Sequence, residues 1–192
     1  RCIFDPLDGT TNFLHGVPHF AISIGLEREG EVIAAVIYQP ISDELFWAEK
    51  GSGAFVDTPA ARSRRLRVSG RKDPARALVG TGLLNIGKSG HADYIPKLAA
   101  VMERTAGVRR WGAAALDLAF VAAGRFDAHF EFGLAPWDVA AGVLLVREAG
   151  GFVGDISGQP YVLGGPSILA SNAGLRDAMV EILTGNRPVE SL

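Results

Sequence analysis

The most informative stretch of the chain is IFDPLDGTTNF, residues 3–13. An apolar strand is predicted to end at Asp5, and Pro6 stiffens the exit. Asp8 follows three positions on, where a tight turn brings its carboxylate beside that of Asp5. Two carboxylates this close repel each other unless a cation lies between them. Oxygen-only ligands of this kind suit Mg²⁺, and the turn also exposes the carbonyl of Leu7 as a further ligand.

The next two residues, Gly9 and Thr10, are predicted to open a helix or a helical turn. Backbone N–H groups at such a start point toward an anion, and glycine lets that anion approach closely. The Thr10 hydroxyl is suited to positioning a water molecule. A strand followed by Asp-Pro-x-Asp-Gly-Thr therefore indicates a combined metal and phosphate site, rather than a plain Asp-Gly turn with Asp5 as a helix N-cap.

Two other kinds of phosphatase chemistry fit less well. Enzymes that work through an aspartyl-phosphate carry Asp-x-Asp-Gly-Thr, with their aspartates two residues apart, whereas Asp5 and Asp8 are three apart. The additional residue changes the relative direction of the two side chains, and no lysine-bearing strand completes that set. A thiol phosphatase needs a Cys-x₅-Arg loop, but Asp8 occupies the arginine position relative to Cys2, the only cysteine.

Composition narrows the function classes. The 192 residues are 48% hydrophobic and 21% charged, which allows a well-buried core, and the net charge is −2. This charge argues against a general nucleic-acid or membrane-surface binder. No apolar run approaches the roughly 18 residues that span a bilayer. We therefore expect no membrane contact. A single cysteine excludes an intrachain disulfide and a cysteine-ligated zinc site, so we expect a cytoplasmic protein.

The chain is predicted to divide into two parts within a mixed α+β fold. Residues 1–72 form an antiparallel sheet half that carries the acidic turn, and residues 73–192 form an α/β half whose helices cover a mixed sheet. Segments rich in β-branched and aromatic residues predict strands over 20–28, 31–39, 44–49, 53–57, 66–69, 77–81, 126–132 and 167–170. Apolar periodicity predicts helices over 91–104, 113–123, 137–149 and 174–183.

The second concentrated signal is APWDVAAG, residues 135–142. Asp138 lies in the first turn of a predicted helix, where the helix dipole favours a negative charge. Small residues over 140–142 let that helix pack closely against a neighbour. On its own this motif is also typical of an ordinary helix start.

Together, the two motifs resemble those of the inositol monophosphatase family. The resemblance extends over nearly the whole chain, through GVPHFAISI at 16–24, GAAALDLA at 112–119 and EAGG at 148–151. The pair Arg109-Arg110 is similar to the bacterial members. The resemblance implies a layered α-β-α-β-α sandwich, a homodimer and inhibition by Li⁺.

The resemblance also implies a set of metal ligands. Two or three Mg²⁺ ions would be held by Asp5, the carbonyl of Leu7, Asp8 and Asp138, with Asp8 bridging two of the ions. Asp138 would also lie near the leaving-group oxygen. Thr10 would orient the attacking water, so that Asp8, Thr10 and Asp138 carry the reaction.

For the substrate, the resemblance implies that the amides of Gly9 and Thr10 hold phosphate and that Glu131 contacts substrate hydroxyls. Residues 112–114 would line the pocket for a small phosphorylated polyol or sugar. The complete implied set is Gly9, Thr10, Gly112, Ala113, Ala114, Glu131 and Asp138. Ala113 stands where many members have Ser or Thr. The resemblance makes inositol monophosphate the leading candidate substrate. Sugar phosphates, fructose bisphosphate, histidinol phosphate and nucleotide 3′-phosphates are the alternatives.

One departure concerns a further metal ligand. The family takes a glutamate from a Gly-Glu-Glu motif upstream of the acidic turn, and this sequence begins after that position. We therefore expect the chain as written to be impaired in catalysis. A regulatory binding protein that keeps the fold is the alternative from another class, although the intact Asp5, Asp8, Thr10 and Asp138 argue for catalysis.

The remaining polar signals have structural interpretations. His15, His19, His91 and His129 show no metal-ligand spacing and are predicted to be packing or surface residues. Basic residues are frequent over 62–72, and in its strand-like part they alternate. This pattern favours the solvated face of a hairpin over a nucleic-acid site.

Overall fold

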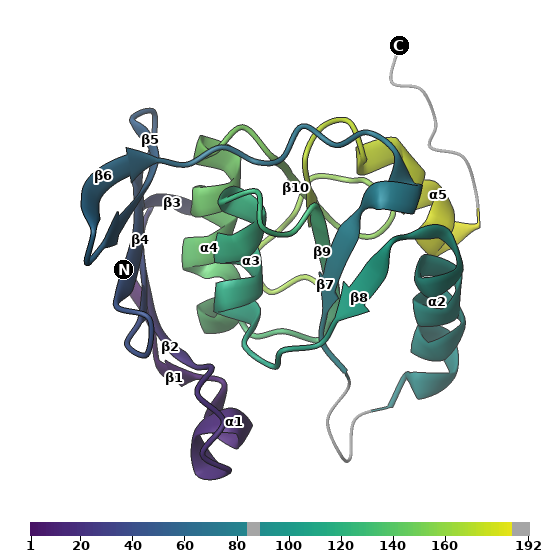
Figure 1. The fold of residues 1–192 in the computed structure, drawn as a ribbon, viewed down its shortest axis with the longest axis horizontal. Coiled ribbons are helices and arrows are strands. Elements are labelled where there is room, and N and C mark those ends of the chain that lie inside the picture. The colour runs from purple at the N-terminus through teal and green to yellow at the C-terminus, as the bar shows by residue number, and fades with distance from the viewer. Residues whose placement is uncertain (84–88, 186–192) are drawn as a thin grey trace.

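The computed structural model describes residues 1–83 and 89–185, which form two sheets and five α-helices (Figure 1). The first sheet is antiparallel throughout and contains, in spatial order, β1 (Cys2–Asp8), β2 (Ala21–Arg28), β3 (Glu31–Gln39), β4 (Glu44–Glu49), β5 (Gly53–Thr58) and β6 (Ala61–Arg65). The second sheet has the order β10 (Phe152–Gly154), β11 (Ser167–Ser171), β9 (Ala128–Phe132), β7 (Leu78–Thr81) and β8 (Gly107–Arg109). Because β7 runs parallel to both β8 and β9 while the other pairs are antiparallel, this sheet is mixed, as predicted.

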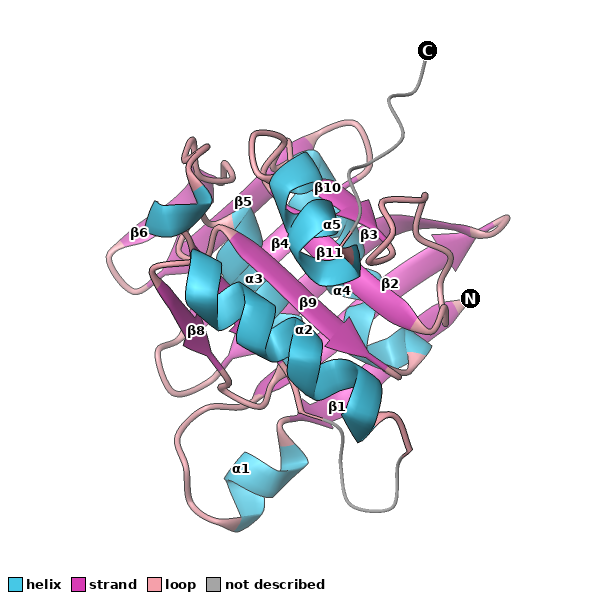
Figure 2. Ribbon diagram, turned by 90° about the vertical axis from the view of Figure 1, so that its right-hand side faces the viewer, coloured by secondary structure: helices cyan, strands magenta, loops and turns pink. Residues whose placement is uncertain are grey.

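Four of the five described helices form two layers, and the short α1 (Thr10–Leu14) lies apart from both (Figure 1). The four are α2 (His91–Arg104), α3 (Ala114–Ala122), α4 (Pro136–Glu148) and α5 (Arg176–Thr184). Figure 1 shows α3 and α4 between the two sheets, and Figure 2 shows α2 and α5 in front of the far face of the second sheet. One apolar core surrounds α3 and α4, and a second lies between α2, α5 and the second sheet.

The mixed α+β fold class is confirmed, and the described residues supply four alternating layers of the implied five. Within residues 1–83 and 89–185, no helix covers the outer face of the first sheet. That face carries exposed apolar side chains, among them Phe4, Ile22 and Leu26. The division of the chain into two parts between residues 72 and 73 stays a prediction. In the structure, α4 contacts strands of both sheets.

The composition of α3 and α4 accounts for their central position. Every residue of α3 is buried, as is the stretch 139–146 of α4. A helix that is apolar on all sides is stable only when other elements cover it all round. The small residues predicted to allow close packing do so, because a Cβ atom at Gly142 would lie 2.5 Å from the Cβ atom of Leu118 in α3.

The predicted strand over 66–69 is wrong. The sixth strand is β6, whose exposed residues give no apolar alternation to signal it. The chain leaves the sheet after β6: the N–H of Leu66 still donates to the Ala54 carbonyl, but that of Val68 donates to the Ala149 carbonyl beyond α4. Leu66 is buried against the helical layer, so its apolar character reflects that contact. The arginines of β6 are exposed, as predicted for the basic stretch.

We expect Gly142→Ala to lower the free energy of unfolding by about 1–3 kcal/mol, because the added methyl group forces α3 and α4 apart. This range is the net change after the roughly 1 kcal/mol that alanine gains over glycine in a helix. Urea denaturation measures the change. Gly70→Ala is the matched control, since a Cβ atom there has no heavy atom within 4 Å. Equal stability of the two variants would contradict this account of the packing.

Candidate active site

The acidic motif lies on a β-bulge. Asp5 pairs with Ser23 of β2, whereas Asp8 pairs with Ala21, so three steps along β1 match two steps along β2. In a regular strand, side chains three positions apart point to opposite faces. The extra residue of a bulge corrects this difference and brings both carboxylates to the same side.

The predicted end of the strand at Asp5 is therefore wrong, since β1 continues to Asp8. Pro6 has no N–H to donate across the sheet, which favours a bulge at this position. The N–H of Leu7 donates instead to Oδ1 of Asp5 at 3.0 Å, and so the bulge is held by one of its own carboxylates.

The third carboxylate comes from the start of α4. The Oδ2 atom of Asp138 accepts the N–H of Ala135 at 2.7 Å, so Asp138 caps the helix while facing β1. One carboxylate oxygen from each of Asp5, Asp8 and Asp138 lies within 4.8 Å of the other two. The structure thus brings together all three of the predicted metal-ligating side chains, which come from two distant motifs.

Asp8 is the buried member of this group, with 7% of its surface exposed. The pKa of Asp8 is raised to about 8, chiefly by burial and also by the charges of Asp5, Asp138 and Glu131, while the backbone N–H of Ala115 lowers it. The Ala115 N–H donates to Oδ2 of Asp8 at 2.9 Å, at the start of α3. A buried carboxylate beside two others is stabilised by a bound divalent cation, so these residues fit Mg²⁺.

The residues after the bulge have the predicted helical turn. Gly9 has a positive φ of 84°, and α1 begins at Thr10. A Cβ atom at Gly9 would lie 3.0 Å from the His19 carbonyl oxygen, so only glycine fits without a shift. The Thr10 hydroxyl donates to the Leu7 carbonyl at 2.9 Å. That carbonyl has a second lone pair, which is still available to a cation.

A cavity of about 300 Å³ joins these groups to the second half of the chain. The predicted residues that line it are Asp5, Leu7, Asp8, Gly9, Thr10, Gly112, Ala114, Glu131 and Asp138. Ala113 is buried and does not appear in the lining, and it starts α3 without a side-chain cap. A larger hollow of about 730 Å³ shares no lining residue with this cavity; it is bordered by basic residues such as Arg67 and Arg71 and lacks a group of neighbouring carboxylates.

Sequence reasoning missed three polar residues in the lining, which are Thr11, Asn12 and Arg110. Asn12 donates from Nδ2 to the carbonyls of His19, at 2.8 Å, and Trp111, at 2.7 Å, and so ties α1 to the loop before α3. Its place directly after the acidic motif was the available signal. Arg110 is the only cation among the described residues that line the cavity. Nothing in the local sequence distinguishes it from Arg109.

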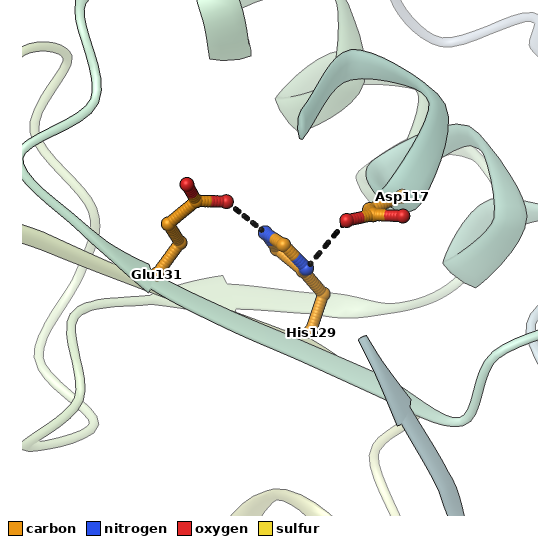
Figure 3. A group of neighbouring side chains, drawn as sticks. All are labelled: Asp117, His129 and Glu131. Atoms are coloured by element: carbon orange, nitrogen blue, oxygen red, sulfur yellow. Dashed lines mark ion pairs between the residues drawn. The ribbon is translucent and has the colours of Figure 1, made fainter. Parts of the chain in front are cut away.

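A second group of polar side chains adjoins the cavity. Figure 3 shows His129 between Asp117 and Glu131, and one ligand-type atom from each lies within 4.8 Å of the others. His129 is fully buried, but the predicted packing role omits its two carboxylate neighbours. The missed signal was the spacing of His129 and Glu131, which in a strand places both side chains on one face.

The fold and the cavity define a mixed α+β protein with clustered oxygen ligands, suited to divalent-cation chemistry on a small substrate. The chain belongs to the inositol monophosphatase family, whose sequence profile matches residues 2–185. The resemblance of the two acidic motifs to that family of phosphatases is therefore confirmed. Among residues 1–83 and 89–185, no helix has both the length and the apolar character that a membrane crossing requires.

Three relatives illustrate the similarity. Inositol-1-monophosphatase of Rhizobium meliloti (strain 1021) is 51% identical over 191 residues, which are 100% of this chain and 69% of the relative. Nus factor SuhB of Pseudomonas aeruginosa (strain PAO1) is 47% identical over 188 residues, which are 97% of this chain and 68% of the relative. The crystal structure of extragenic suppressor protein suhB from Bartonella henselae has a TM-score of 0.90 and 50% identity, covering 96% of this chain and 70% of that one.

We expect Asp8→Asn to stabilise the metal-free protein at high pH. The folded-state pKa of Asp8 is about 8, against roughly 4 when unfolded. Between these values only the unfolded chain loses the proton, so the contribution of Asp8 to stability falls as pH rises from about 4 to about 8. Asparagine does not titrate and keeps an acceptor for the Ala115 N–H.

Thermal unfolding without metal, from pH 4 to pH 8, measures the difference between wild type and variant, which should grow in favour of the variant. Added Mg²⁺ should raise the melting temperature of the wild type and leave the variant nearly unchanged. A difference in melting temperature that does not vary with pH would refute the raised pKa of Asp8.

Proposed function

We propose that this chain forms the metal- and phosphate-binding part of a Mg²⁺-dependent phosphatase for small phosphate monoesters, with inositol monophosphate as its substrate. The observation that carries the proposal is the grouping of Asp5, Asp8 and Asp138 in one cavity beside Glu131. Membership of the inositol monophosphatase family supports the reaction class. The name of the Rhizobium meliloti relative supports the choice of substrate.

In this proposal, Asp5, Asp8, Asp138 and the carbonyl of Leu7 hold two or three Mg²⁺ ions, and Li⁺ inhibits. Bound divalent ions supply an acidified water and neutralise the charge that develops on the phosphate group. Asp8 would be a central ligand of the ions, because it is the buried member and lies beside both other carboxylates.

The protein groups around the ions then orient the reactants. The amides of Gly9 and Thr10 hold the phosphate oxygens, and the Thr10 hydroxyl orients the attacking water for direct in-line displacement. Asp138 lies beside the leaving group. Glu131, whose side chain is 14% exposed and lines the cavity, accepts hydrogen bonds from hydroxyls of the substrate. Gly112 and Ala114 form the wall next to the sugar or inositol ring.

A second candidate is a regulatory role, because relatives at 46–47% identity, including the Pseudomonas aeruginosa protein, carry the name Nus factor SuhB. Such a role requires a surface for a partner and does not require the carboxylate group. The two functions are compatible in one protein. The expected homodimer, the cytoplasmic location and the absence of a nucleic-acid partner stay predictions.

We expect Asp138→Asn to reduce phosphate release from inositol 1-phosphate by at least about 100-fold, because it removes a charged ligand and leaves the helix cap nearly intact. The protein is expressed from its complete gene and assayed with Mg²⁺. Asp177→Asn on the exposed first turn of α5 is the matched control and should keep full activity. If the wild type releases no phosphate from inositol, sugar, histidinol or nucleotide 3′-phosphates, the proposal fails.

The same substitution separates the two candidate functions in cells. We expect an Asp138→Asn allele in place of the native gene to reproduce the phenotype of a deletion if the cellular role is catalytic. A purely regulatory protein does not need this carboxylate and should then behave as the wild type. Growth and protein abundance measure the outcome, with Asp177→Asn as the control allele.

A further inference from the structure

The side chains Asp117, His129 and Glu131 form a row (Figure 3), and Glu131 at one end of it lines the active-site cavity. His129 and Glu131 are two positions apart in β9, so their side chains lie on the same face of the sheet. This face is turned toward α3, which carries Asp117. The Nδ1 atom of His129 lies 3.6 Å from Oδ2 of Asp117, and its Nε2 atom lies 3.4 Å from Oε2 of Glu131. The exposed fraction of the side chain is 1% for Asp117, 0% for His129 and 14% for Glu131.

Two glycines of the neighbouring segment make room for this row. Gly80 lies opposite His129 in the parallel pairing of β7 with β9, and a Cβ atom there would be 3.1 Å from Nδ1 of His129. A Cβ atom at Gly82 would lie only 1.8 Å from Oε1 of Glu131. The packing around the row therefore depends on two positions that have no side chain.

The row costs the fold free energy. Burial raises the pKa of Asp117 well above its usual value, and the charges of Glu131 and Asp8 add to this effect. Among the described residues, neither nitrogen of His129 has a partner within ordinary hydrogen-bond distance. Apolar residues would fill the same volume at lower cost, since buried polar groups without close partners are destabilising. A row of this cost that ends in the cavity points to a use there.

The geometry favours a relay of hydrogen bonds over a metal site. A metal ion binds one ring nitrogen of a histidine, whereas each nitrogen of His129 faces a different carboxylate. Two hydrogen bonds along the row require two protons, one between each nitrogen and its carboxylate. Contacts of 3.4 and 3.6 Å are slightly long for hydrogen bonds, and such contacts often tighten when a substrate binds.

We propose that His129, held in turn by Asp117, is a positioning residue that orients the Glu131 carboxylate toward the hydroxyl groups of the substrate. This inference rests on the proposed function and adds to it the structural determinant of substrate selection. Among the described residues, His129 and Asp117 do not line the cavity and form a group separate from the three aspartates, although the charge of Asp8 acts on Asp117. Their effect therefore falls on the binding of polyol phosphates and not on the hydrolysis of a phosphate ester that lacks such hydroxyls.

The test compares inositol 1-phosphate with p-nitrophenyl phosphate, whose leaving group has no hydroxyl. We expect His129→Phe to lower kcat/KM for inositol 1-phosphate by about 10- to 100-fold, mainly through KM. For p-nitrophenyl phosphate, kcat/KM should stay within about 2-fold. His129→Gln keeps a donor that can reach Glu131 and should recover part of the loss. Asp117→Asn should have a smaller effect of the same kind. His129→Gln and Asp117→Asn keep the test decisive if His129→Phe fails to fold.

Several results would overturn the inference. An equal loss on both substrates, in variants with wild-type melting temperature, would show a general structural role. Full activity of His129→Phe on inositol 1-phosphate would show no role at all. A His129-dependent rise in melting temperature with Zn²⁺ alone would make the row a metal site. A wild type inactive on both substrates would instead refute the proposed function, and the positioning role with it.

Discussion

Repulsion among carboxylates is the constraint on which this site depends. Asp5, Asp8 and Asp138 share a volume too small for three charges without a cation, and Asp8 is largely removed from water. The backbone offsets part of the cost: the Ala115 N–H bonds Asp8 and the Ala135 N–H bonds Asp138. The starts of α3 and α4 thus hold the acidic group, because the free N–H groups of a helix start favour negative charge.

The middle helical layer connects stability with the site. Both helices that contribute backbone donors to the acidic group are the ones buried between the sheets. Their close approach at Gly142 and Leu118 sets the spacing of the two helix starts. Since Asp8 comes from the first sheet and Glu131 from the second, the cavity exists only while this layer keeps the sheets at their observed separation.

Much of the fold follows from local signals. The pair Glu29-Gly30, for example, has positive φ at both residues, as a tight hairpin between β2 and β3 requires. The bulge in β1 could not be placed, because Asp-Pro-Leu-Asp suits both a turn and a bulge until the pairing with β2 is known. β6 was missed because its exposed arginines have no apolar period. Grouping of the two acidic motifs was predictable only through the family resemblance.

The row that begins at Asp117 shows a different limit. Its members look like core or surface residues individually, and their meaning comes from the packing of α3 on β9 beside two glycines. Asp5 and Asp8 of the metal group come from the first sheet and His129 and Glu131 of the row from the second, and the two groups share no residue. A substitution in the row can therefore change which alcohol is bound while the bulge, both helix caps and the three aspartates stay in place. Relatives of such a fold can differ in substrate while keeping the same acidic motifs, and for this reason those motifs predict the reaction class better than the substrate.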